Sequence, residues 1–178
     1  GGDLVEEEAG PAEDAATAAA DGPRPDPGVS LDPVAARLAA LRSGDAGRVR
    51  AALSGPLDPV LTGQVLQLLA WDAMQRRAVA ALRGMAPRVS GQLLDALLDG
   101  EQDFAIRRRV PRVLEGVATQ RVVDGLLLGL DDRRFEVRFQ CGRALAHLRY
   151  GKGSELRYDR QRVLACPVSY THLRAHET

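Results

Sequence analysis

Aromatic side chains and lysines are scarce in this chain. Aromatic residues make up 4% of its 178 residues, whereas hydrophobic residues reach 45%. Leucine and alanine supply most of that apolar content, which favours helices over strands. Lys152 is the only lysine, so 23 of the 24 basic residues are arginines. We interpret this bias as a consequence of GC-rich coding and not as a functional use of arginine.

Cysteine is also rare, and long hydrophobic runs are missing. Cys141 and Cys166 are too few for a disulfide framework, so we expect a reducing, cytoplasmic setting. No stretch approaches the roughly 20 consecutive apolar residues of a membrane span. The chain starts at Gly1 and its only methionines are Met74 and Met85, so we expect the natural protein to begin upstream.

The formal net charge of zero hides an uneven distribution along the chain. Residues 1–30 carry eight acidic residues against Arg24, a net charge of −7, and contain few large apolar residues. Such a segment cannot bury enough surface to offset its ordering entropy, so it is predicted to be a disordered acidic linker. Residues 31–167 carry +7, which is moderately basic and below the charge of a nucleic-acid-binding arm.

An internal repeat occupies residues 57–149. Segments that begin at Met74, Ile106 and Val137 are 32 and 31 residues apart, and in each the positions i, i+4, i+7 and i+8 are apolar. That spacing predicts one buried face of a helix. A second predicted helix alternates with this first one, and its copies are Val60 to Leu69, Val89 to Leu98 and Arg121 to Leu130.

Turn and capping residues separate these predicted helices. Gly84 to Pro87 predicts a turn between two helices, while Asp103 and Thr119 are expected to cap the helices that follow them. Leu31-Asp-Pro-Val34 recurs as Leu57-Asp-Pro-Val60, where Asp fits the N-cap and Pro the first helical position. Residues 31–42 and 45–54 are therefore predicted to be two further helices.

These features resemble HEAT-repeat proteins of the bacterial HEAT-like type, over residues 31–150. The resemblance implies an all-α fold, a right-handed solenoid of about four stacked helix pairs. It also implies a kink at Pro111 in a first helix. In the family, an Asp and an Arg join neighbouring repeats by hydrogen bonds, and the matching residues here are Asp99, Arg107, Asp131 and Arg138.

The C-terminal part divides into two segments. Residues 151–167 are predicted to be a turn and the start of a further, truncated helix. Residues 168–178 resemble translated sequencing-adapter read-through and do not continue the repeat, so we exclude them from the functional argument. Without them His147 is the only histidine, which leaves no metal cluster and no catalytic triad.

The sequence therefore predicts no enzyme, no cofactor and no metal site. His147 is expected to stabilise a helix C-terminus, and Cys141 is expected to be a small core residue. Gly151-Lys-Gly-Ser154 lacks the upstream glycine and the strand of a phosphate-binding loop, so it is interpreted as a turn.

The function that we predict is a non-catalytic scaffold for a protein or peptide partner. The contact surface is expected on the second helices, at Gln92, Asp95, Gln120, Arg121 and Asp124. Gly125 and Gly129 either admit a partner there or allow close packing between repeats.

Two alternatives stay open. One is a nucleic-acid-binding protein of the DNA-repair type, and the other is the regulatory repeat region of a larger enzyme or membrane protein. Nucleic acid is disfavoured because the arginine clusters fall on the first helices, away from the surface that a duplex would occupy. These clusters comprise Arg76, Arg77, Arg107 to Arg109, Arg112, Arg138 and Arg143.

Overall fold

All regular secondary structure in the described part of the chain is helical. The computed structural model describes residues 32–161, so the predictions for residues 1–30, 168–178 and Cys166 lie outside it. The elements are α1 (Pro33–Arg42), α2 (Ala46–Ala52), the 3₁₀ helix η1 (Pro59–Leu61), α3 (Thr62–Leu68), α4 (Gln75–Leu98), α5 (Phe104–Arg107), α6 (Val110–Leu114), α7 (Gln120–Gly129) and α8 (Phe135–Arg149). The predicted all-α class is confirmed.

Four of the helix starts are capped by the residues that the sequence predicted. The carboxylates of Asp32 and Asp58 accept hydrogen bonds from the backbone N–H groups two residues later, and a proline follows each of them in the first helical turn. Asp103 caps α5 at 2.7 Å from the Ala105 nitrogen, and Thr119 caps α7 through its hydroxyl. Each cap satisfies a backbone donor that the helix itself leaves unpaired.

The turn predicted at Gly84 to Pro87 is wrong. Helix α4 continues through these residues, and the only departure from helical geometry is at Val89, with φ −121° and ψ 17°. Pro87 supplies no N–H to the Arg83 carbonyl, which weakens the helix at this point. The two predicted helices are therefore joined at a kink at Val89, without a separate turn between them.

Pro111 has a stronger effect than the predicted kink. The first helix of that unit is divided into α5 and α6, with Arg108 and Arg109 between them, and Pro111 lies in the first turn of α6. A proline ring is tolerated there because the N–H that it lacks has no partner within the helix. The matching position in α8 is Gly142, and α8 runs without interruption from Phe135 to Arg149.

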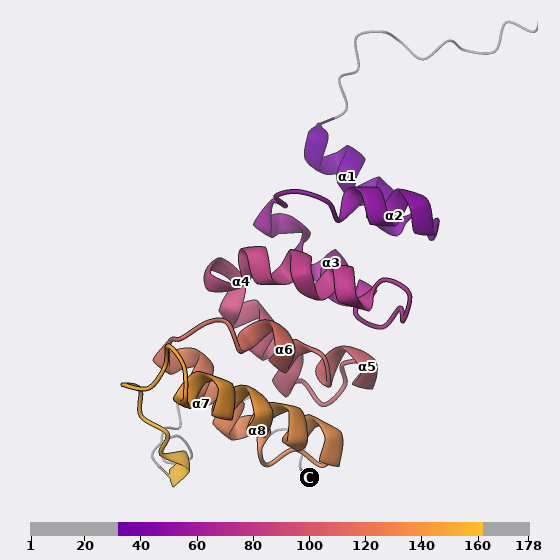
Figure 1. Ribbon diagram of the computed structural model, residues 1–178. Coiled ribbons are helices and arrows are strands. Elements are labelled where there is room, and N and C mark those ends of the chain that lie inside the picture. Colours follow the sequence, from indigo (N-terminus) through magenta and orange to yellow (C-terminus); the bar gives the residue numbers. More distant parts are fainter. Residues whose placement is uncertain (1–31, 162–178) are drawn as a thin grey trace, which may run out of the picture. The chain divides into compact units, whose positions relative to one another are not determined.

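The helices contact one another in two rows (Figure 1). The first-helix row consists of residues 75–88 of α4, then α5 and α6, then α8; Arg83 of α4 donates to the Arg112 carbonyl of α6. The second-helix row consists of α1, α3, residues 89–98 of α4, and α7. Contacts between α7 and α8 join the two rows. The apolar side chains buried between the rows form one cluster from Leu41 to Leu148.

The glycine pair of α7 lies inside this packing. A Cβ atom on Gly125 would stand 2.3 Å from Leu94 Cδ2 of α4, and one on Gly129 would stand 2.4 Å from Cys141 Sγ of α8. Both glycines are buried. Of the two interpretations left open, close packing between helices is therefore the one that holds.

Candidate interaction surface

The predicted contact residues lie on the second-helix row. Gln92 and Asp95 of α4 are exposed, and so is Arg121 of α7. On this row, a long polar side chain of one helix lies over a glycine of the preceding helix. The Gln92 amide nitrogen lies 3.7 Å from the Cβ position of Gly63, and the Arg121 guanidinium covers Gly91. The same arrangement thus occurs at two successive helix contacts.

Gln120, the first residue of α7, binds the backbone of a later segment. Its amide nitrogen donates to the Arg157 carbonyl at 2.8 Å, and its amide oxygen accepts from the Arg157 N–H at 2.9 Å. The amide nitrogen also donates to the Asp124 carboxylate at 2.8 Å. The two bonds to Arg157 match the donor and acceptor of one residue, as a neighbouring β-strand would.

The segment around Arg157 has further contacts with the helices. The Tyr158 hydroxyl donates to the Gly153 carbonyl at 2.8 Å, and the Arg149 guanidinium lies 5.6 Å from the centre of the Tyr158 ring. Arg160 forms an ion pair with Asp131 at the end of the second-helix row. Burial raises the pKa of Tyr158. Sequence analysis assigned residues 151–167 to a turn and a helix start and did not foresee these contacts.

Replacing Gln120 by methionine is expected to release this segment. Methionine has a similar length but neither donates nor accepts as the amide does, and one net hydrogen bond contributes about 1 kcal/mol. The backbone N–H of Arg157 should therefore exchange with deuterium at least about fivefold faster, measured by NMR. The matched control is Gln92→Met, which should leave Arg157 unchanged. Equal exchange in Gln120→Met and the unaltered protein would contradict the contact.

The residues predicted to join neighbouring repeats have separate partners. Arg107 is buried, and it donates to the Leu97 carbonyl at 3.0 Å and forms an ion pair with Asp132. Asp99 accepts from the Glu101 N–H, and Arg138 donates to the carbonyls of Asp132 and Arg133 in the preceding loop. Of the four predicted residues, Arg107 and Asp131 have partners outside their own helix pair. No two of the four residues contact each other through a hydrogen bond or an ion pair that the described residues form.

Other arginines carry most of the polar links between units. Arg83 pairs with Glu115 at 2.8 Å, Arg109 with Asp72 at 2.8 Å, and Arg108 with Glu136 at 3.4 Å. The hydrogen bond and charge of Arg109 lower the pKa of the Asp72 carboxyl. Sequence analysis missed Asp132 because it adjoins Asp131 in a doublet, and periodicity alone does not say which carboxylate turns toward Arg107.

The histidine and cysteine among residues 32–161 belong to no metal-binding group. No group of three or more His, Cys, Asp or Glu side chains in this range is arranged to hold a metal ion. His147 is exposed in the last turn of α8, where a cation favours the helix dipole. Cys141 is fully buried, as predicted for a core residue. Burial, with a smaller contribution from the Asp132 charge, raises the pKa of its thiol to about 12.

The Cys141 thiol is expected to resist alkylation in the folded protein. With its pKa near 12 instead of 9.0, thiolate at pH 8 is on the order of 1,000-fold scarcer than in the unfolded chain. A Cys166→Ser variant treated with a maleimide should therefore react fully only after denaturation, as read by mass spectrometry. The stability that comes from keeping this thiol protonated is present below pH 9 and is lost as the pH rises toward 12. Rapid labelling of a fully helical sample would contradict the burial of Cys141.

Comparison with known proteins assigns no family. The chain matches no protein-family model, no curated protein and no solved structure. Within residues 32–161, no helix has the length and apolar character needed to cross a bilayer.

Proposed function

We propose that this chain is a non-catalytic scaffold that binds an extended peptide segment of a protein partner. The architecture that we propose is a HEAT-like right-handed solenoid of about four helix pairs. Contacts between alternate helices support it, because stacked repeats bury their apolar faces only against their neighbours. The arginine links between units support it too, since Arg83–Glu115 and Arg108–Glu136 join residues 32 and 28 positions apart.

The observation that carries the proposal is the contact between Gln120 and the backbone of Arg157. An amide that satisfies both the donor and the acceptor of one residue recognises a peptide backbone whatever its side chain. Gln120 belongs to the predicted contact surface with Gln92, Asp95, Arg121 and Asp124. We infer that a partner peptide is held in the same way along the second-helix row.

Charge on this surface favours a basic peptide. Asp131 already holds Arg160 of the chain's own segment, and Asp95 presents an exposed carboxylate on the preceding helix. Electrostatic complementarity of this kind speeds association and selects among partners. The partner segment is therefore proposed to be extended and to carry arginine or lysine.

A peptide-display selection against the intact chain tests this proposal. Enriched peptides should be basic, and Asp95→Arg should weaken their binding about tenfold or more. Glu101→Arg makes the same charge change on an exposed loop residue and should leave binding intact. Peptides that bind all variants equally would refute the surface assignment.

Duplex DNA provides the opposing test. If DNA binds tightly, loses affinity steeply between two salt concentrations and requires Arg112 and Arg143, the nucleic-acid alternative replaces the peptide scaffold. Both arginines are exposed on the first-helix row, so their substitution should not disturb the core. The scaffold proposal expects weak DNA binding that these substitutions do not change.

A further inference from the structure

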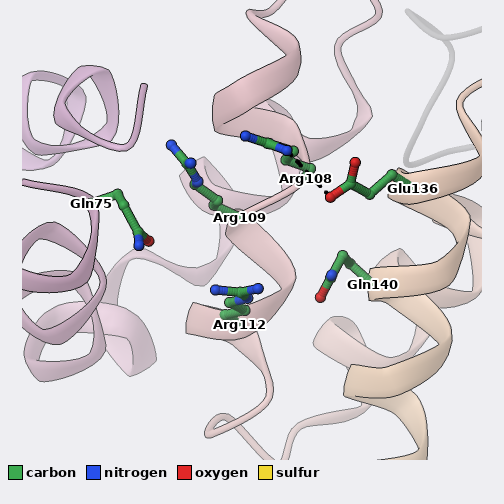
Figure 2. A pocket seen from close by; sticks show the side chains of 6 residues that line it. All are labelled: Gln75, Arg108, Arg109, Arg112, Glu136 and Gln140. Carbon is green, nitrogen blue, oxygen red and sulfur yellow. Dashed lines mark hydrogen bonds and ion pairs between the residues drawn. The ribbon is translucent and has the colours of Figure 1, made fainter. Parts of the chain in front are cut away.

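A polar pocket opens among three successive elements of the first-helix row, away from the proposed peptide surface. Its volume is about 190 Å³. Figure 2 shows its side chains: Gln75 from α4, Arg108 and Arg109 from the link between α5 and α6, Arg112 from α6, and Glu136 and Gln140 from α8. No apolar side chain lines it, so the pocket is suited to a charged or strongly polar group.

The three arginines of this pocket differ in the hydrogen bonds and ion pairs that they already form. Arg109 is engaged by the Leu69 carbonyl and Asp72. Arg108 has one long contact with Glu136, 3.4 Å, and its guanidinium lies 5.6 Å from the centre of the Phe104 ring. The Arg112 guanidinium forms no hydrogen bond with any residue in the range 32–161. Arg108 and Arg112 therefore retain N–H donors for another group.

Buried polar atoms in the pocket lack partners. Gln140 is only 7% exposed, and its side-chain amide has no hydrogen-bond partner among the described residues. Gln75 Oε1 and Arg108 Nε are buried and unpaired as well. Folded proteins pair nearly all such atoms, since leaving them unpaired is costly. The two buried unpaired atoms, with the Gln140 amide beside them, favour a polar group in the pocket.

The charge of the pocket lining and the arrangement of its side chains indicate which class of ligand it binds. Three guanidinium groups and one carboxylate leave the lining with a net charge of +2, or +1 when Asp72 is counted with Arg109. In Figure 2 Arg108 and Arg112 lie above and below the space, while Gln75 and Gln140 flank it on opposite sides. A planar carboxylate accepts donors within one plane, whereas a tetrahedral oxyanion accepts them from all of these directions.

We propose that this pocket binds a phosphate-type oxyanion, carried by a small molecule. Its oxygens accept from the terminal guanidinium N–H groups of Arg108 and Arg112 and from the amide N–H groups of Gln75 and Gln140. Pockets for drug-sized ligands span roughly 300–1,000 Å³, so this smaller pocket encloses the oxyanion and leaves the remainder of the molecule outside. The site is independent of the peptide surface, and neither proposal requires the other.

Binding is tested on the full chain with inorganic phosphate and sulfate, at constant ionic strength and with acetate as the planar anion. Calorimetry and thermal unfolding should show binding of phosphate and sulfate, a raised Tm, and no comparable effect of acetate. Arg112→Gln should weaken phosphate binding tenfold or more. Arg143→Gln is the matched control, because Arg143 is exposed at the corresponding position of α8, and it should behave as the unaltered protein.

Gln140→Met separates a binding role from a structural one. If the amide is there to bind an anion, methionine leaves the Tm in phosphate-free buffer about unchanged and the phosphate response is lost. A lowered Tm with an intact phosphate response would overturn the proposal. So would an equal response to phosphate in the unaltered protein and in Arg112→Gln.

Two other results would also overturn the proposal. If acetate matches phosphate, the pocket does not select a tetrahedral anion. If none of the three anions binds, water alone fills the space. Displacement of phosphate by duplex DNA at low salt, with loss of DNA binding in Arg112→Gln, would assign the pocket to a nucleic-acid backbone instead of a small molecule.

Discussion

Arg107→Met is expected to destabilise the folded chain by about 3–5 kcal/mol. Arg107 is 6% exposed, and it holds the Asp132 carboxylate and the Leu97 carbonyl at the contact between two units. Methionine fills similar space but leaves Asp132 as a partly buried charge without its partner. Urea unfolding followed by circular dichroism should show a lower midpoint with an unchanged slope.

A second substitution in the same chain tests the cause. Arg107→Met combined with Asp132→Asn should recover much of the loss, because the amide carries no charge and its oxygen still accepts from the Arg134 N–H. Arg138→Met is the comparison in the next repeat, where the guanidinium donates to two carbonyls of its own loop and lies over the Phe135 ring. We expect a loss of about 1–2 kcal/mol there. Equal losses at Arg107 and Arg138 would contradict a special role for the buried ion pair.

Gly125→Ala is expected to destabilise the fold by about 1–3 kcal/mol, although alanine favours helices. The added methyl group would stand 2.3 Å from Leu94 Cδ2, and Leu94 is itself 1% exposed and has little room to move. The same substitution at Gly84 of α4 meets nothing within 4 Å and should stabilise the protein by up to about 1 kcal/mol. Thermal unfolding of the two variants should shift in opposite directions.

The Leu94 partner provides a double-mutant cycle. Leu94→Ala alone should cost about 2–5 kcal/mol, since it leaves a cavity against Gly125. Adding Gly125→Ala to it should then restore part of the stability, because the methyl group occupies space that leucine vacated. Additive losses in the double variant would show that α4 and α7 do not meet at these residues.

Local signals account for what the sequence predicted well. Asp32, Asp58, Asp103 and Thr119 cap helices because a cap depends on a side chain and a backbone N–H two or three residues away. Helical periodicity likewise placed Cys141 in the core, since the buried face of a helix follows from its own spacing. The effect of proline was less predictable: Pro87 lies two residues before the break at Val89 within α4, whereas Pro111 lies in the first turn of a new helix.

Local sequence signals did not predict the contacts between residues of different helix pairs. Arg107 selects Asp132 and not Asp131 because the loop before α8 turns one carboxylate of the doublet toward it. The contact of Gln120 with Arg157 spans 37 positions. The pocket beside Gln140 is formed by residues of α4, of α6 with the link before it, and of α8. It exists only where these helices pack together, so the sequence alone did not predict it.

The sequence by itself determined the helical class, the capped starts of the helices and the apolar face of each repeat, because these depend on residues within about two turns of one another. Only the tertiary structure decided which arginines are held by neighbouring units, that Gly125 and Gly129 serve packing, and that Gln75 Oε1 and Arg108 Nε are buried without partners. Rotation and spacing between packed helices set these features, and many side chains contribute to each contact, so no single stretch of sequence records them.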